Sequence, residues 1–324
     1  MIAISKPPVI INAIENIVVF LRAQVLRVTY PKYFHNDTAG YEPQPFVDIL
    51  GGTSTKIERR TTTWDLKTTY QSDTGTTKVL LINKFDPARP TLIYHHGAGD
   101  TQPLRDFRRI FPSEFIIGYN TFVIHAQNHT TRSDYLHHSV DSFLHHQETF
   151  AGSVLAVDEI IKYHRSNSKQ PVVVTGVSMG GIVASLHAFF FGSADQYFSM
   201  VAYPNAGEVF LGNAYKTAVD DWADKRKQPG YINSFAISSF DPALTGKVFP
   251  ILGSADRIVP FDQSFEFWNS RGFETKVFPY GHFTPGIVAK EIREYMTSRM
   301  KNITQPVAAH QQPHPALSSQ ERVM

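Results

Sequence analysis

The stretch Val172-Val-Val-Thr-Gly-Val-Ser178-Met-Gly-Gly181 decides the fold prediction. Its first four residues form a short apolar run that is typical of a strand buried on both faces of a sheet. The segment that follows, residues 180–191, has a helical pattern. Gly176 and Gly180 leave room for a close approach of strand and helix, so the pattern predicts a sharp turn that exposes the hydroxyl of Ser178 at the sheet edge. The alternative is a glycine-rich turn that contains an incidental serine.

Short apolar runs of the same kind recur along the chain and alternate with segments of helical period. The expected strands are residues 91–94, 121–124, 198–202, 248–252 and 275–278, and the expected helices are residues 149–164, 261–271 and 285–300. This alternation predicts an α/β fold with a mostly parallel sheet that is covered by helices on both sides. Ahead of these runs, two β-rich segments within residues 61–85 flank a polar turn at residues 71–75, which predicts an antiparallel hairpin.

The domain organisation follows from where this pattern begins, breaks and ends. We expect an N-terminal extension with an amphipathic helix over residues 1–60 and a main domain over residues 61–300. Residues 205–246 are aromatic, carry mixed charge and are too long for a plain crossover, which indicates a cap insertion over the strand ends. Residues 301–324 are rich in Pro, Gln, His and Ser and are expected to form a flexible tail.

The segment Pro8–Val28 is apolar, but Glu15, Arg22 and Arg27 interrupt it and no small-residue cleavage site follows. We therefore expect neither a membrane span nor an export signal, and a cytoplasmic protein. One helical stripe is apolar and is expected to pack on the domain: Ile10, Ile14, Ile17, Val18, Leu21, Val25 and Val28. The additional apolar residues Val19, Phe20 and Leu26 widen the stripe, so contact with a membrane surface or with a second copy of the chain stays as the alternative.

The composition excludes several classes of function. Hydrophobic residues make up 42% of the 324 residues, which indicates a globular fold rather than disorder. The 31 Lys and Arg residues nearly balance the 29 Asp and Glu residues, and without a long basic run we expect no nucleic-acid partner. The sequence has no cysteine, so a thiol nucleophile and a thiolate metal site are excluded.

A serine hydroxyl becomes a nucleophile when a histidine accepts its proton and a carboxylate orients that histidine. Asp256 follows the expected strand 248–252, and His282 follows the expected strand 275–278. Because parallel strands end at one edge of the sheet, we predict that Ser178, Asp256 and His282 form a catalytic triad. Taken singly, Asp256 suits a solvated turn, and His282 is one of 14 histidines.

These motifs resemble those of the α/β-hydrolase superfamily, in its esterase, lipase and peptidase-like serine branch. The resemblance covers residues 61–300 and rests on four segments in family order: His96-Gly97-Ala98-Gly99, Gly176-Val-Ser178-Met-Gly180, Ser254-Ala-Asp256-Arg-Ile-Val-Pro260 and Gly281-His282. It implies an eight-stranded sheet with one antiparallel strand near its start and an active site under a cap.

The resemblance also places the oxyanion hole, where backbone N–H groups stabilise the negative charge that develops on an attacked carbonyl. We expect the amides of Met179 and Ala98 to be the donors, with Gly99 as the alternative to Ala98. His95 and His96 begin this loop and are expected to shape it rather than to react.

The remaining candidates concern ligands. Six histidines invite a metal hypothesis, but they lack acidic partners at ligand spacing, so we expect no metal and no cofactor; they are His125, His129, His137, His138, His145 and His146. Five aromatic residues are candidates for an apolar acyl pocket, with core or cap packing as the alternative: Tyr203, Phe210, Trp222, Phe261 and Phe283.

We therefore predict a carboxylic-ester hydrolase of the esterase or lipase type. It would act on small-molecule esters with apolar groups through an acyl-enzyme intermediate. The same triad also serves peptidases, amidases, thioesterases and acyltransferases, which stay open as alternatives. A non-catalytic binding protein with this fold is the remaining hypothesis, and the presence of all three triad residues argues against it.

Overall fold

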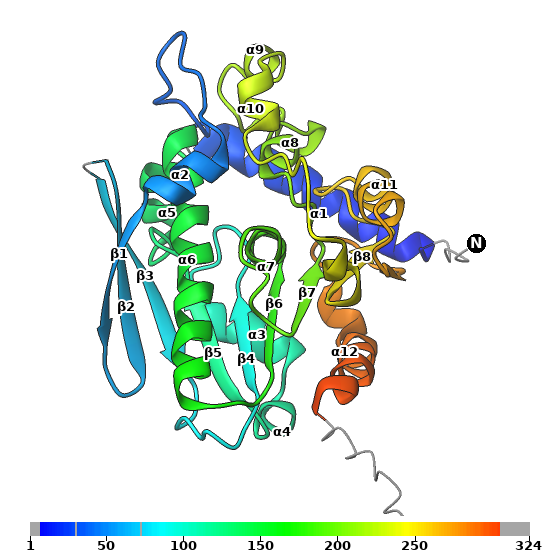
Figure 1. The fold of residues 1–324 in the computed structure, drawn as a ribbon. Coiled ribbons are helices and arrows are strands. Elements are labelled where there is room, and N and C mark those ends of the chain that lie inside the picture. Colours follow the sequence, from blue (N-terminus) through cyan, green and yellow to red (C-terminus); the bar gives the residue numbers. More distant parts are fainter. Residues whose placement is uncertain (1–6, 30, 72, 305–324) are drawn as a thin grey trace, which may run out of the picture.

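A computed structural model describes residues 7–29, 31–71 and 73–304, and Figure 1 shows its fold. This part of the chain contains one nine-stranded sheet in the order β1-β2-β3-β5-β4-β6-β7-β8-β9. The strands are β1 (Ser54–Arg59), β2 (Thr63–Tyr70), β3 (Asp73–Leu81), β4 (Thr91–His95), β5 (Asn120–His125), β6 (Val172–Val177), β7 (Gln196–Met200), β8 (Val248–Gly253) and β9 (Lys276–Phe278). Strands β4 to β9 pair in parallel, whereas the pairs β1–β2, β2–β3 and β3–β5 are antiparallel. The predicted mostly parallel sheet and hairpin are confirmed.

The central strands are buried almost throughout and mostly apolar, because both faces of the sheet are covered. Along β4 and β6, alternate residues enter two separate cores: Ile93 and Val174 lie in one, and Leu92 and Val173 lie in the other. The first core lies under α6 (Phe143–Asn167), α7 (Met179–Phe190) and α11 (Phe261–Ser270). The second lies under α3 (Pro103–Ile110) and α12 (Ala289–Thr304). This two-sided burial explains why the strands read as continuous apolar runs.

The structure differs from the prediction in the number of strands and at the C-terminal end of the domain. The expected eight-stranded sheet has a ninth strand in the described residues, because β1 pairs antiparallel with β2. Its residues are mostly exposed and polar, so no apolar alternation marked it. The helix expected over residues 285–300 begins as a 3-10 helix, η3 (Pro285–Val288), and α12 continues to Thr304. The first four residues of the expected tail are therefore helical, and residues 305–324 lie outside the described residues.

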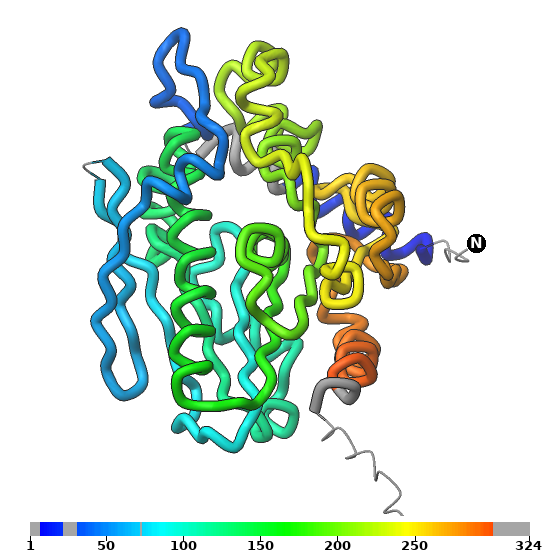
Figure 2. The backbone as a smooth tube through the Cα atoms, viewed as in Figure 1, coloured from blue at the N-terminus to red at the C-terminus, as the bar shows by residue number. Residues whose placement is uncertain are grey.

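The segment predicted as a cap is a series of short helices: α8 (Ala206–Phe210), η1 (Asn213–Tyr215), α9 (Trp222–Lys225), α10 (Pro229–Asn233) and η2 (Pro242–Gly246). It is joined to residues that follow the N-terminal helix. The Tyr33 N–H donates to the carbonyl of Ala218 at 2.8 Å, and the Phe46 N–H donates to the carbonyl of Ser234 at 2.7 Å. Phe46 begins helix α2 (Phe46–Gly52). Figure 2 shows these two parts of the chain beside each other at the top of the view.

The N-terminal helix α1 (Val9–Thr29) crosses the end of the sheet at which the parallel strands finish (Figure 1). The expectation that its main apolar stripe packs on the domain is wrong where the side chains are described. Ile10, Ile14 and Ile17 are 67%, 37% and 58% exposed, and the helix instead buries Ile11 and Glu15. In the described part of the chain, no helix combines the length and the apolar character needed to cross a membrane.

Candidate active site

Ser178 lies at the turn between β6 and α7 in a backbone conformation that L-residues rarely adopt, with φ 57°. The two flanking glycines make this turn possible. A Cβ on Gly176 would overlap the backbone of Gly180, and a Cβ on Gly180 would overlap the carbonyl of His95. Strand, helix and the neighbouring loop therefore meet at van der Waals distance around the serine, as the sequence predicted for this turn.

The three polar residues of the predicted triad lie together. The Oγ of Ser178 is 2.9 Å from Nε2 of His282, and Nδ1 of His282 is 2.9 Å from Oδ2 of Asp256. The other oxygen of Asp256 accepts the N–H groups of Ile258 and Val259 at 2.8 and 2.9 Å. A carboxylate at Nδ1 keeps the ring proton on that nitrogen, which leaves Nε2 free to accept the proton of the serine.

A pocket of about 750 Å³ opens at this site. Gly97, Ala98 and Gly99 line it together with Ser178 and His282. A Cβ on Gly97 would lie 3.6 Å from the Cβ of Ser178, so the loop passes directly beside the serine. Gly99 has φ +70°, a conformation that favours glycine. The predicted oxyanion donors of this loop, Ala98 and its alternative Gly99, therefore both border the space in front of the serine.

Met179, the other predicted donor, is the first residue of α7 and has a buried side chain. The first N–H groups of a helix have no partner within the helix, and the helix dipole makes this end partially positive. The amide of Met179 therefore belongs to the end of α7 at which a negative charge is stabilised.

Two buried histidines fix the loop. The ring of His96 makes two hydrogen bonds: its Nδ1 donates to the carbonyl of Gly97 at 2.7 Å, and its Nε2 accepts the N–H of Ala126 at 3.0 Å. His95 bonds the carbonyl of His96 through Nδ1, at 2.8 Å, and Ser153 through Nε2, at 2.9 Å. Both rings hold backbone in place, and neither lines the pocket.

Two solved structures have a similar fold. Acetyl xylan esterase 1 from Thermoanaerobacterium sp. JW/SL YS485 is 16% identical, and the match covers 85% of this chain and 98% of that chain with a TM-score of 0.51. The acetyl xylan esterase from Paenibacillus sp. R4 is 10% identical, with coverages of 90% and 95% and a TM-score of 0.50. The chain has the α/β-hydrolase fold. The sequence matches no protein-family model and no curated protein.

The five aromatic candidates occupy different places in the structure. Phe283 lines the pocket that contains Ser178. Phe261 lines a second pocket of about 700 Å³ that also reaches Asp256. Tyr203 and Phe210 are buried in the core, and Trp222 packs against it. Core packing, the alternative reading of the sequence, thus accounts for the positions of these last three.

Sequence analysis missed two polar residues that support the loops of the site. Glu15 of α1 accepts the N–H of Phe283 at 2.9 Å, and Ser153 bonds His95. Glu15 and Ser153 lie on helices that are distant in sequence from the residues they contact, and no motif marks either of them. Glu15 was read only as an interruption of an apolar segment.

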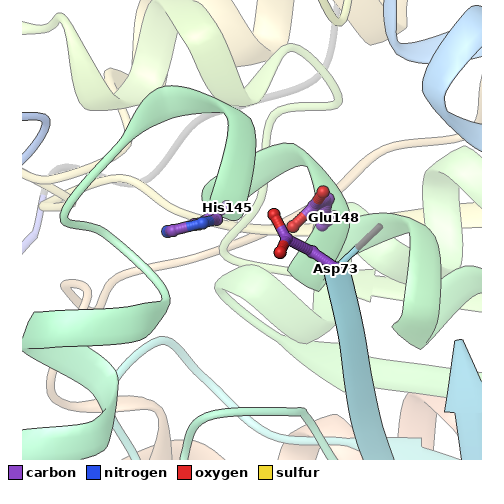
Figure 3. Close-up of side chains that lie close together, drawn as sticks. All are labelled: Asp73, His145 and Glu148. Atoms are coloured by element: carbon purple, nitrogen blue, oxygen red, sulfur yellow. The ribbon is translucent and has the colours of Figure 1, made fainter. Parts of the chain in front are cut away.

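Near the N-terminus of α6 lies the only metal-type cluster in the described residues, formed by Asp73, His145 and Glu148 (Figure 3). Their ligand atoms lie within 4.8 Å of one another. The expectation that these histidines lack acidic partners is therefore wrong for His145: Glu148 follows it by three residues on α6, and Asp73 comes from β3. The Nδ1 of His145 is already bonded to Asp141 at 2.9 Å. None of the three residues lines the Ser178 pocket, so the cluster has no part in the site.

Burial keeps several histidines of the fold neutral. It lowers the pKa of His95 and of His146 to about 3 and that of His129 to about 4. In an unfolded chain a histidine takes up a proton near pH 6.5. In the folded protein these histidines stay neutral to a much lower pH. The unfolded chain therefore binds more protons below about pH 6.5, and lowering the pH favours unfolding. Each such residue should cost up to about 1.4 kcal/mol of unfolding free energy per pH unit below about pH 6.5.

We predict that His146→Leu makes the loss of stability in acid shallower by up to about 1.4 kcal/mol per pH unit. His146 lies among phenylalanine rings, so leucine suits its surroundings. Urea unfolding at pH 4.5, 5.5, 6.5 and 8 measures the slope. The matched control is Phe143→Leu in the same cluster, which removes packing but no titrating group and should lower stability equally at every pH. An unchanged slope in His146→Leu would contradict the prediction.

Proposed function

We propose that this protein is a serine hydrolase that cleaves carboxylic esters, with Ser178 as the nucleophile. The observation that carries the proposal is the unbroken chain of hydrogen bonds from Ser178 through His282 to Asp256, two contacts of 2.9 Å each. The strained turn at Ser178 and the glycine loop beside it support the same chemistry. Elements far apart in the sequence supply these parts, so a chance arrangement of serine, histidine and aspartate is a poor explanation.

In the first half of the reaction, the hydroxyl of Ser178 attacks the ester carbonyl while Nε2 of His282 takes its proton. Asp256 stabilises the imidazolium that forms, because its carboxylate already bonds Nδ1. The amides of Met179 and of Ala98 or Gly99 stabilise the oxyanion. His282 then gives the proton to the leaving alcohol, which departs and leaves an acyl group on Ser178.

In the second half, His282 takes a proton from water as the water attacks the acyl-enzyme. The tetrahedral intermediate collapses, the acid product leaves and the proton returns from His282 to Oγ of Ser178. This sequence of steps requires the triad, the amides of the oxyanion hole and water.

The pocket wall indicates the kind of ester. Ile110, Phe283 and Ile287 give the wall an apolar part, and Arg105 and Arg109 lie with Asp106 in another part. Both arginines are paired with Asp106, at 3.4 and 2.9 Å. An acyl or alcohol group of moderate size and apolar character fits the apolar part of this wall.

Two measurements on the wild-type protein test the proposal. A fluorophosphonate probe should label the protein covalently, since it reacts with activated serines. A panel of p-nitrophenyl esters with acyl chains of two to twelve carbons, run beside the matching p-nitroanilides and thioesters, should show the highest kcat/KM for esters. Absence of labelling would overturn the serine-hydrolase proposal. Labelling with faster turnover of anilides or thioesters would instead favour the amidase or thioesterase alternative.

A further inference from the structure

Glu15 has an unusual position for a carboxylate. It lies in the middle of α1 and is 0% exposed, while the isoleucines before and after it, Ile14 and Ile17, face outward. Acidic side chains are seldom fully buried unless they have a specific partner. Burial is the main influence on this group and raises its pKa, and the N–H of Phe283 opposes that shift. Burying a carboxylate costs desolvation free energy, so the contacts that Glu15 makes need an explanation.

The partners of Glu15 are the two residues that follow His282. Its Oε1 accepts the N–H of Phe283 at 2.9 Å and lies 3.3 Å from the hydroxyl of Thr284. The same hydroxyl oxygen accepts the N–H of Gly281 at 2.8 Å. The backbone on both sides of His282 is therefore tied, directly or through Thr284, to one carboxylate oxygen.

Gly281 makes this approach possible. A Cβ at position 281 would overlap Cγ and Cδ of Glu15, so any other residue there would displace the Glu15 side chain from its place against the loop. The Glu15 side chain thus occupies the space that a side chain at position 281 would need. The second oxygen, Oε2, is buried without a hydrogen-bond partner in the described structure. A carboxylate that served only to stabilise the fold would be expected to have both oxygens hydrogen-bonded, so the geometry favours a role for Oε1 at the loop.

We propose that Glu15 is a positioning residue for His282: its carboxylate holds the backbone of residues 281–284 so that Nε2 of His282 stays within hydrogen-bond distance of Ser178. This inference rests on the proposed serine-hydrolase function. It makes α1 part of the catalytic unit, although the sequence suggested an extension outside it. A shift of about 1 Å in a catalytic group is enough to slow a reaction about 100-fold, so a contact to the supporting backbone can affect the rate strongly.

Two variants separate the length of the side chain from its charge. Glu15→Gln keeps an oxygen at the position of Oε1 and removes the charge, whereas Glu15→Asp keeps the charge and withdraws the carboxylate by one methylene. We expect kcat of Glu15→Asp to fall about 10- to 100-fold with little change in KM, and kcat of Glu15→Gln to stay within about threefold of wild type. Asn16→Ala, at an exposed position of the same helix, is the matched control and should leave both constants unchanged.

A second readout does not depend on turnover. Hydrogen–deuterium exchange of the peptide that contains residues 281–284 should be slow in the wild type and in Glu15→Gln, and faster in Glu15→Asp. If Glu15→Asp does not fold, the variant Thr284→Val takes its place in both measurements. That variant removes the hydroxyl that links Gly281 to Glu15, and should lower kcat several-fold and speed up the same exchange.

The outcomes distinguish the inference from the function on which it rests. A wild-type protein that does not react with fluorophosphonate would overturn the proposed function. A reactive wild type whose Glu15→Asp form has full kcat and a lower Tm would overturn the positioning role and leave Glu15 with packing alone. Loss of kcat in Glu15→Gln but not in Glu15→Asp would also overturn it, because the charge rather than the hydrogen bonds would then matter.

Discussion

Replacement of Ser178 by alanine is expected to abolish fluorophosphonate labelling and to lower kcat for esters by about 10⁴- to 10⁶-fold, the range for loss of a serine nucleophile. The physical reason is that no neighbouring group can form the acyl-enzyme in its place. Ser178 Oγ is the atom that bonds Nε2 of His282. The pocket and the loop amides would remain, so KM should change much less than kcat.

The structure offers a matched control for this variant. Ser166 is exposed near the end of α6, and its hydroxyl donates to the carbonyl of Lys162 at 2.8 Å. Ser166→Ala should label and turn over like the wild type. Intact-mass measurement of the labelled protein, with a thermal melt for each variant, checks both. Labelling of Ser178→Ala at the wild-type rate would show that another residue is the reactive serine.

Asp256→Asn is expected to lower kcat about 10⁴-fold while the fold is retained, because the amide imposes the wrong histidine tautomer. One oxygen of Asp256 accepts the N–H groups of Ile258 and Val259. In the variant, the amide oxygen would keep these two bonds and turn its NH₂ group toward Nδ1 of His282. The ring would then carry its proton on Nε2, where it cannot accept the proton of Ser178.

The control for this change is Asp262→Asn, at an exposed position in the first turn of α11. It alters the net charge by the same amount and should leave kcat and KM unchanged. The pH profile of kcat/KM separates a catalytic from a structural effect. We expect loss of the orienting carboxylate to change the shape of the profile, whereas a purely structural effect would scale the whole profile by one factor. A profile with full activity would contradict the orienting role of Asp256.

The turn at Ser178 and the order of the site residues were predictable because the constraints on them are local. The strand before Ser178 and the helix after it are apolar because they are buried in any sheet covered on both sides. The turn between them needs Gly176 and Gly180, since a Cβ at either position would overlap backbone. These constraints act within a few residues, so the sequence displays them directly. Asp256 and His282 were predictable for a related reason, because parallel strands end at one edge of a sheet.

The supporting contacts were not predictable in this way. His96 shapes the glycine loop by bonding Ala126 of the segment after β5, and Glu15 reaches Phe283 across 268 positions of sequence. Strand β1 carries no apolar alternation, because most of its side chains are exposed. Each of these features depends on a surface that exists only after other elements have packed.

The contrast is sharpest in α1. By itself the sequence determined that residues near the N-terminus form a helix with apolar side chains and one acidic interruption, because helical period and composition are local properties. It did not determine which side faces inward, since Ile10 and Ile14 are as apolar as Ile11. Only the tertiary structure decided this. The space left by Gly281 and the N–H of Phe283 accommodate the carboxylate of Glu15, so the helix turns this polar residue inward and turns Ile10, Ile14 and Ile17 outward.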